Sequence, residues 1–194
     1  MKKLLSIVAL GLVTTSMALA QGQLNFANGA SGVNAPFSDA LPPDGTGAKL
    51  SGAAYVAGLW WAAGATVSDP NLLAFANITS PFDSAPVNAG YFFGAARSIA
   101  GTAAGDMITA QVRVWDVAHG STYDAVKAAT GGHWGTSGLI NNIKLGGAGG
   151  IPVPNLVGMG TTGIRLTVNP VPEPSTLALA GLGLAAMLVI RRRK

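Results

Sequence analysis

The chain of 194 residues contains no cysteine, and only 10% of its residues are charged. The absence of cysteine excludes a disulfide scaffold, a thiolate metal site and a cysteine nucleophile. Stability must then come from a hydrophobic core, which a domain of about 150 residues is large enough to form. The low charge argues against long solvated helices, and the 27 glycines favour many turns and short strands instead.

Basic residues are scarce outside the two ends of the chain. Lys2, Lys3 and the run Arg191–Lys194 account for half of the 12 basic residues. The segment from residue 21 to residue 174 holds six basic residues against eight acidic ones, a net charge of −2. Phosphate neutralisation needs lysines and arginines clustered on a folded surface. The charge pattern therefore predicts no nucleic-acid partner.

The first twenty residues have the three parts of a secretory signal peptide. Lys2 and Lys3 provide the positive region, and the apolar run Leu4–Val13 follows. Ala18 and Ala20 place small residues at the positions that signal peptidase reads. We expect export and cleavage before Gln21. We assign residues 21–169 to one exported domain.

The last twenty-four residues also fall into three parts. Pro172, Glu173 and Pro174 lie at the centre of a short polar segment, residues 171–176. An apolar run, residues 176–190, precedes the basic tail, residues 191–194. At about 1.5 Å per residue this run would reach about 22 Å, somewhat short of a hydrocarbon core of about 30 Å. The cations stay on the cytoplasmic side, so the pattern predicts a single transmembrane helix with the domain outside.

This arrangement resembles the PEP-CTERM sorting signal of exported proteins in Gram-negative bacteria. The resemblance rests on Pro172-Glu173-Pro174, the apolar run and the terminal arginines. It implies that an exosortase-type membrane enzyme processes an inner-membrane-anchored precursor near Pro172-Glu173-Pro174 and passes the protein to the cell surface or the exterior. We assign residues 170–194 to this sorting signal. The alternative is an ordinary C-terminal membrane anchor with a proline-rich stalk.

Residues 21–169 read as a mainly β domain. Apolar and polar residues alternate over 107–117, with Ile108, Ala110, Val112 and Val114 predicted on the buried face. The same pattern in 163–169 places Ile164, Leu166 and Val168 inward. Segments 53–61 and 91–99 are more uniformly apolar, as in strands covered on both faces. Short strands between turn signals predict an antiparallel two-sheet sandwich, jelly-roll-like in form.

One short helix is expected inside this domain. Ser121 is a candidate N-cap, with Asp124 three residues later as in a capping box. Gly131 follows the helix-forming residues and is placed to end the helix in the left-handed conformation.

The sequence offers no convincing catalytic, metal or cofactor site. The glycine pattern of residues 158–163 matches a dinucleotide fingerprint, but a strand pattern follows where a helix is needed. His119 and His133 are the only histidines, and even with Asp116 nearby they rarely form a closed metal site. Ser137 lacks the glycine of a nucleophile elbow two residues later, so a hydrolase is the weakest hypothesis. We therefore predict a protein that is not an enzyme and binds no cofactor or metal.

Two functions remain open for the domain. The first is a structural role at the cell surface or in the extracellular matrix. The second is a carbohydrate-binding module for exopolysaccharide, because Trp115 lies on the predicted polar face of its strand and tryptophan rings stack on sugars.

Overall fold

The structure is a computed structural model that describes residues 21–39, 47–160 and 163–171, with Met187 and Arg191. The predicted signal peptide with Ala18 and Ala20, the Pro172-Glu173-Pro174 motif and nearly all of the predicted membrane span lie outside the described residues. Within the described part of the chain, no helix has both the length and the apolar character needed to cross a membrane.

Six strands form the main sheet, and every pairing within it is antiparallel. The order is β12-β9-β8-β5-β6, and β10 also pairs with β8. The longest strand, β8, therefore lies at the centre and pairs with three neighbours. The bounds are β5 (Tyr55–Ala63), β6 (Ala74–Pro81), β8 (Met107–Asp116), β9 (His133–Thr136), β10 (Ile140–Lys144) and β12 (Thr167–Val168).

Three two-stranded sheets complete the strand pairing in the described residues. Two are antiparallel, β1–β7 and β2–β3, and one is parallel, β4–β11. Their bounds are β1 (Gln23–Ala27), β2 (Gly29–Ala30), β3 (Val33–Asn34), β4 (Phe37–Ser38), β7 (Phe93–Ser98) and β11 (Ile164–Arg165). The mainly β class is confirmed. The two-sheet sandwich stays a prediction, because the strands facing the main sheet are divided among small sheets.

The alternation predicted for β8 is confirmed on its inward face. Ile108, Ala110, Val112 and Val114 are all at most 1% exposed and belong to the main hydrophobic core. This core lies between the main sheet and the small sheets, where side chains from both interdigitate. Its largest fully buried side chains include Leu24, Phe26, Phe37, Leu50, Leu59 and Phe92.

A second, smaller core covers the other face of β5 and β8. It contains Trp60, Leu73, Trp115, Tyr123 and Val126. Leu59 packs into the main core while Trp60 packs into the second, so β5 is buried on both faces as its uniformly apolar sequence predicts. A short helix, residues 123–128, and the segment after β5 cover this face. The alternation in β8 had predicted that it would be exposed to solvent.

Two strand predictions are wrong in detail. The 91–99 segment is not covered on both faces: Phe92 and Ile99 are buried, but within β7 only Gly94 is, because the other elements leave the rest of this strand exposed. Segment 163–169 is two short strands with different partners, since β11 pairs with β4 and β12 with β9. Val168 is consequently 40% exposed at the edge of the main sheet, although Leu166 is buried as predicted.

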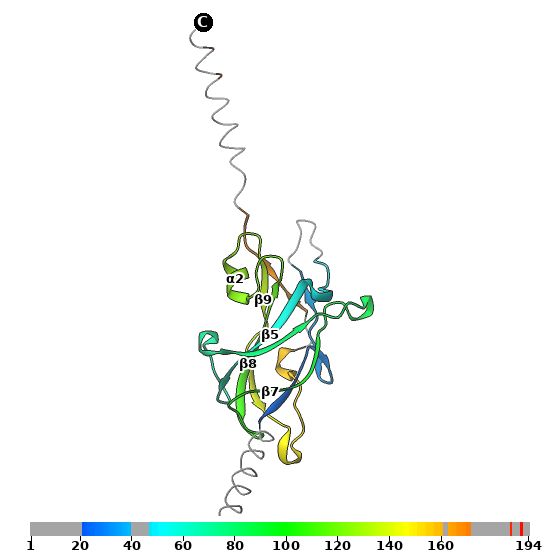
Figure 1. Ribbon diagram of the computed structural model, residues 1–194, viewed down its shortest axis with the longest axis vertical. Coiled ribbons are helices and arrows are strands. Elements are labelled where there is room, and N and C mark those ends of the chain that lie inside the picture. The colour runs from blue at the N-terminus through cyan, green and yellow to red at the C-terminus, as the bar shows by residue number, and fades with distance from the viewer. Residues whose placement is uncertain (1–20, 40–46, 161–162, 172–186, 188–190, 192–194) are drawn as a thin grey trace, which may run out of the picture.

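The predicted helix is present as α2 (Tyr123–Ala128), but its N-cap is one residue later than expected. Thr122, not Ser121, accepts a hydrogen bond from the Ala125 N–H at 3.3 Å. Gly131 has the expected positive φ, 75°, two residues beyond the C-cap Ala129. Figure 1 places α2 and β9 at the end of the domain from which residues 170–171 depart, and the start of β1 at the opposite end.

Candidate functional site at the C-terminal end of the domain

Two histidine–aspartate pairs lie at this end of the domain. Asp116, the last residue of β8, contacts Nδ1 of His119 through Oδ2 at 2.7 Å. His133, the first residue of β9, makes the equivalent contact through Nδ1 with Asp39. A carboxylate only accepts hydrogen bonds, so each imidazole donates its Nδ1 proton to its partner. The two rings lie nearly parallel, with centroids 6.2 Å apart and planes inclined by 23°.

Backbone and phenol groups complete this network. Asp116 also accepts hydrogen bonds from the backbone N–H groups of His119 and His133, at 3.2 and 3.1 Å. Tyr55 donates its hydroxyl proton to Asp39 at 2.6 Å. Burial and then the Asp39 contact raise the pKa of Tyr55 well above its ordinary range. Tyr55 therefore keeps its proton at every physiological pH and acts as a hydrogen-bond donor.

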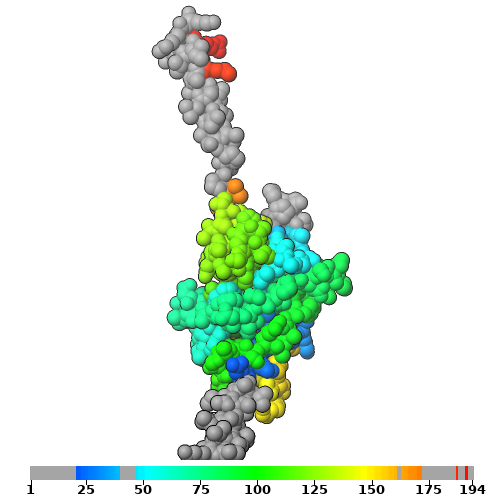
Figure 2. Space-filling view, viewed as in Figure 1, coloured from blue at the N-terminus to red at the C-terminus, as the bar shows by residue number. Residues whose placement is uncertain are grey.

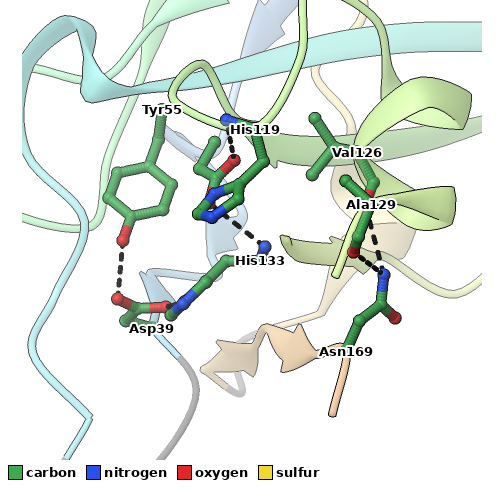
Figure 3. Close-up of polar contacts among 8 residues, drawn as sticks. Asp39, Tyr55, His119, Val126, Ala129, His133 and Asn169 are labelled. Carbon is green, nitrogen blue, oxygen red and sulfur yellow. Dashed lines mark hydrogen bonds and ion pairs between the residues drawn. The ribbon is translucent and has the colours of Figure 1, made fainter. Parts of the chain in front are cut away.

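The network joins segments that are remote in the sequence. Tyr55 begins β5, Asp116 ends β8 and His133 begins β9, so the contacts tie three neighbouring strands at one end of the main sheet. Figure 3 shows Asp39 between Tyr55 and His133, with His119 beside them. Within the described residues neither imidazole has a serine or threonine hydroxyl as partner. The described histidines and carboxylates also form no group of three or more placed to hold a metal ion.

The last residues of the domain are held by a second set of contacts, which we name the Asn169 clamp. Its side-chain amide donates to three carbonyl oxygens at the end of α2, those of Val126, Lys127 and Ala129, at 3.2, 2.8 and 2.7 Å. Its Oδ1 accepts from the Trp134 indole at 3.0 Å. Helix C-terminal carbonyls lack partners inside the helix. The backbone N–H groups of Ala129 and Gly132 donate to two of these carbonyls, those of Val126 and Ala129. Asn169 adds a side-chain donor to all three from a segment 40 residues or more away in the sequence.

Trp115 is not where the sugar-binding hypothesis requires it. The hypothesis places its ring on a solvent-exposed face, but the residue is only 4% exposed and packs in the second core. The alternation pattern failed because both faces of β8 are covered. The Trp115 ring meets Trp60 edge to face, with centroids 6.2 Å apart, and its buried Nε1 has no hydrogen-bond partner among the residues that the structure describes.

The structure brings together some of the residues that the sequence singled out and separates others. Asp116, His119 and His133 form one network. Ser137 does not take part in this network. It is buried, and its hydroxyl oxygen accepts a hydrogen bond from the backbone N–H of Val112. Asp39 and Tyr55 were missed because no local motif marks them; Asp39 lies 94 residues before its partner His133.

Comparison with protein families decides the nature of the segment that follows the Asn169 clamp. Residues 170–194 match the family model of the PEP-CTERM protein-sorting motif. The C-terminal segment is a PEP-CTERM sorting motif. The match begins directly after Asn169 and includes Pro172, Glu173 and Pro174. No curated protein and no solved structure matches the chain.

The PEP-CTERM motif implies that the protein is exported, processed by an exosortase and sorted to the cell surface. The geometry adds that the motif follows the domain without a spacer. Asn169 is paired on both its backbone groups, donating to the Gly132 carbonyl at 3.0 Å and accepting from the Gly131 N–H at 3.2 Å. The folded domain thus extends to the first residue of the motif.

Proposed function

We propose that the mature domain has a structural, non-enzymatic role at the cell surface or in the extracellular matrix. The observation that carries this proposal is the PEP-CTERM motif directly behind a tightly held domain end. The His–Asp network supports it, because its hydrogen bonds connect strands of the same sheet and so serve to hold the fold together.

The structural role is tested by removing the more exposed of the two imidazoles in the His–Asp network. His119→Gln is introduced on the exposed side of the network, where the histidine side chain is 37% exposed. Cells that lack the protein are complemented with wild type or with this variant, and matrix recovery and cohesion are compared. We expect equal recovery. Loss of matrix function in a variant that is still folded and exported would instead assign an active role to the imidazole.

We further propose the membrane topology of the precursor. Residues 1–20 direct export and are removed by signal peptidase, and residues 176–190 cross the inner membrane once, leaving Arg191–Lys194 in the cytoplasm. A fusion of alkaline phosphatase after Asn169 is expected to be active, and a fusion after Lys194 inactive. Activity at both junctions contradicts a single span.

Carbohydrate binding remains a second candidate, now on different grounds. A cavity of about 330 Å³ beside α2 is lined by four aromatic residues together with Thr79, Ser121, Thr122 and Asp124. One of the four, Phe75, is 41% exposed and lies against Trp60 with ring centroids 4.7 Å apart. A partly exposed ring beside hydroxyl and carboxylate groups suits a sugar ring, whose faces are apolar and whose edges are polar.

Phe75→Ala separates the two candidates. If the cavity binds polysaccharide, this variant loses retention on the polysaccharide that retains the wild type. Phe93→Ala is the matched control, since Phe93 is 48% exposed and lies outside this cavity. Equal retention of all three proteins excludes this cavity as the sugar site. Retention of none across a panel of neutral and acidic polysaccharides leaves the structural role as the supported function.

A further inference from the structure

Asn169 forms six hydrogen bonds at the junction between the domain and the PEP-CTERM motif. Three side-chain hydrogen bonds reach the end of α2, one comes from Trp134, and two backbone bonds join it to Gly131 and Gly132. Lys127 lies over the Trp134 ring, with Nζ 5.0 Å from the ring centroid, and adds a cation–π contact to the same cluster. These contacts hold Asn169 against the domain, so the exit point of the tail has a fixed position.

The covalent geometry of the chain then limits how far the motif extends from the domain. Consecutive residues span at most about 3.6 Å, so the Cα atom of Glu173 lies within about 14 Å of the Cα atom of Asn169. A small folded domain is about 30 Å across. An enzyme whose active site encloses Pro172-Glu173-Pro174 must therefore touch the domain around the clamp for as long as the clamp stays closed.

The surface that it touches is set by the elements around the clamp. We name this surface the exit face; it consists of α2, β12 and the first residues of β9. A Cβ atom added to Gly131 would lie 3.4 Å from His119 Nε2 and 3.5 Å from Val171 Cγ2, so the departing chain borders the His–Asp network as well. In Figure 2 the yellow-green surface that includes α2 forms the end of the domain beside the orange residues before the tail.

We propose that Asn169 is a positioning residue for the sorting reaction. By fixing the exit point, it presents Pro172-Glu173-Pro174 at a set distance from the exit face, which docks on the exosortase during processing. This inference rests on the proposed processing of the tail and adds to it a requirement for the folded domain. The clamp stays closed through the encounter, because opening it would remove the amide donor that three carbonyls at the end of α2 share.

The decisive variant lengthens the connection without touching the clamp. Gly-Ser-Gly-Ser is inserted between Asn169 and Pro170, which keeps every hydrogen bond of Asn169 and frees the motif from the exit face. A longer flexible tether lowers the effective concentration of the motif at an active site that the exit face has engaged. We expect the conversion of full-length precursor to mature protein, followed by pulse-chase in exosortase-containing cells, to slow by about fivefold or more. Its urea unfolding midpoint stays that of the wild type.

A matched insertion and an isosteric substitution complete the test. The same four residues inserted between Gly149 and Gly150, where added side-chain atoms meet nothing within 4 Å, should leave the conversion rate unchanged. Asn169→Asp keeps the acceptor for Trp134 but cannot donate to the α2 carbonyls, so it should slow conversion as well. Conversion of the exit insertion at the wild-type rate or faster, or equal slowing by both insertions, overturns the proposal.

The proposed processing can fail separately. If the wild-type protein recovered from the cell surface still carries Arg191–Lys194, or matures equally in cells that lack the exosortase, the tail is not an exosortase substrate in that cell. The positioning role is then refuted with it. If the wild type matures normally and the insertion between Asn169 and Pro170 leaves the conversion rate unchanged, the positioning role alone is refuted.

Discussion

The carboxylate of Asp116 accepts a hydrogen bond from the backbone N–H of His133 at 3.1 Å. This contact joins the last residue of β8 to the first residue of β9, and the same carboxylate holds the imidazole of His119. Asp116 is only 5% exposed, so water cannot replace it as a partner. A single buried side chain thus fixes the loop after β8 and the start of the neighbouring strand.

We expect Asp116→Asn to lower the free energy of unfolding by about 2 kcal/mol. Asparagine replaces one of the two acceptor oxygens with an NH₂ group, which cannot accept a hydrogen bond from the N–H groups that Asp116 now satisfies. Urea unfolding of the purified protein at neutral pH measures this loss. Asp124→Asn is the matched control: Asp124 is exposed in the first turn of α2, and its loss should cost less than about 1 kcal/mol. Equal effects of the two substitutions would contradict the role assigned to Asp116.

The titration of Tyr123 predicts a loss of stability at high pH. Burial raises the pKa of Tyr123 from 10.0 to about 12, because the second core disfavours the charged phenolate. The stabilising contribution is complete below the unfolded-state pKa and disappears as the pH rises through the folded-state pKa. The Tyr123→Phe variant should lack this part of the loss of folding stability at high pH. Absorbance of tyrosinate near 295 nm, followed beside urea unfolding, checks both parts of the prediction; a wild-type spectrum in which Tyr123 ionises near 10 refutes it.

Gly146 is expected to tolerate no side chain. A Cβ atom at this position would lie 2.0 Å from the carbonyl oxygen of Pro152, and Gly146 also exchanges backbone hydrogen bonds with Gln23 at 2.9 Å. Gly146→Ala should therefore destabilise the domain by about 2 kcal/mol or more through forced backbone movement. Gly138→Ala, with open space around the added methyl group, should change stability by less than about 0.5 kcal/mol. Thermal or urea unfolding of both variants distinguishes these outcomes.

Phe92 and Phe93 are neighbours in sequence with opposite environments. Phe92 is 0% exposed, and its ring centroid lies 4.7 Å from that of Phe26 and 5.8 Å from that of Phe82. Phe92→Ala should cost about 3–5 kcal/mol because it leaves a cavity in the main core. Phe93, 48% exposed, should cost less than half as much when it is replaced by alanine. Comparable losses would show that the main core does not depend on the aromatic cluster.

The local sequence pattern correctly predicted some elements and the faces that they bury. The alternation in β8 identified its inward face correctly, and turn signals with helix-forming residues located α2 to within a residue or two. The same reasoning failed for β7 and Val168, because whether a face of a strand is covered depends on which other elements pack on it, and that is not encoded in the hydrophobicity of the strand itself. It also failed for Trp115, since the polar face of β8 is buried by segments that the period-two pattern cannot register.

The sequence alone determined the sorting motif, because its recognition depends on the order of proline, glutamate, apolar and basic residues within one continuous segment. It also determined the mainly β character, which follows from local composition and spacing. Only the tertiary structure decided that Asp39 and Tyr55 join the histidines and that Asn169 caps α2. Those contacts link residues tens of positions apart, and such pairings arise from the way the strands dock, which no local pattern encodes.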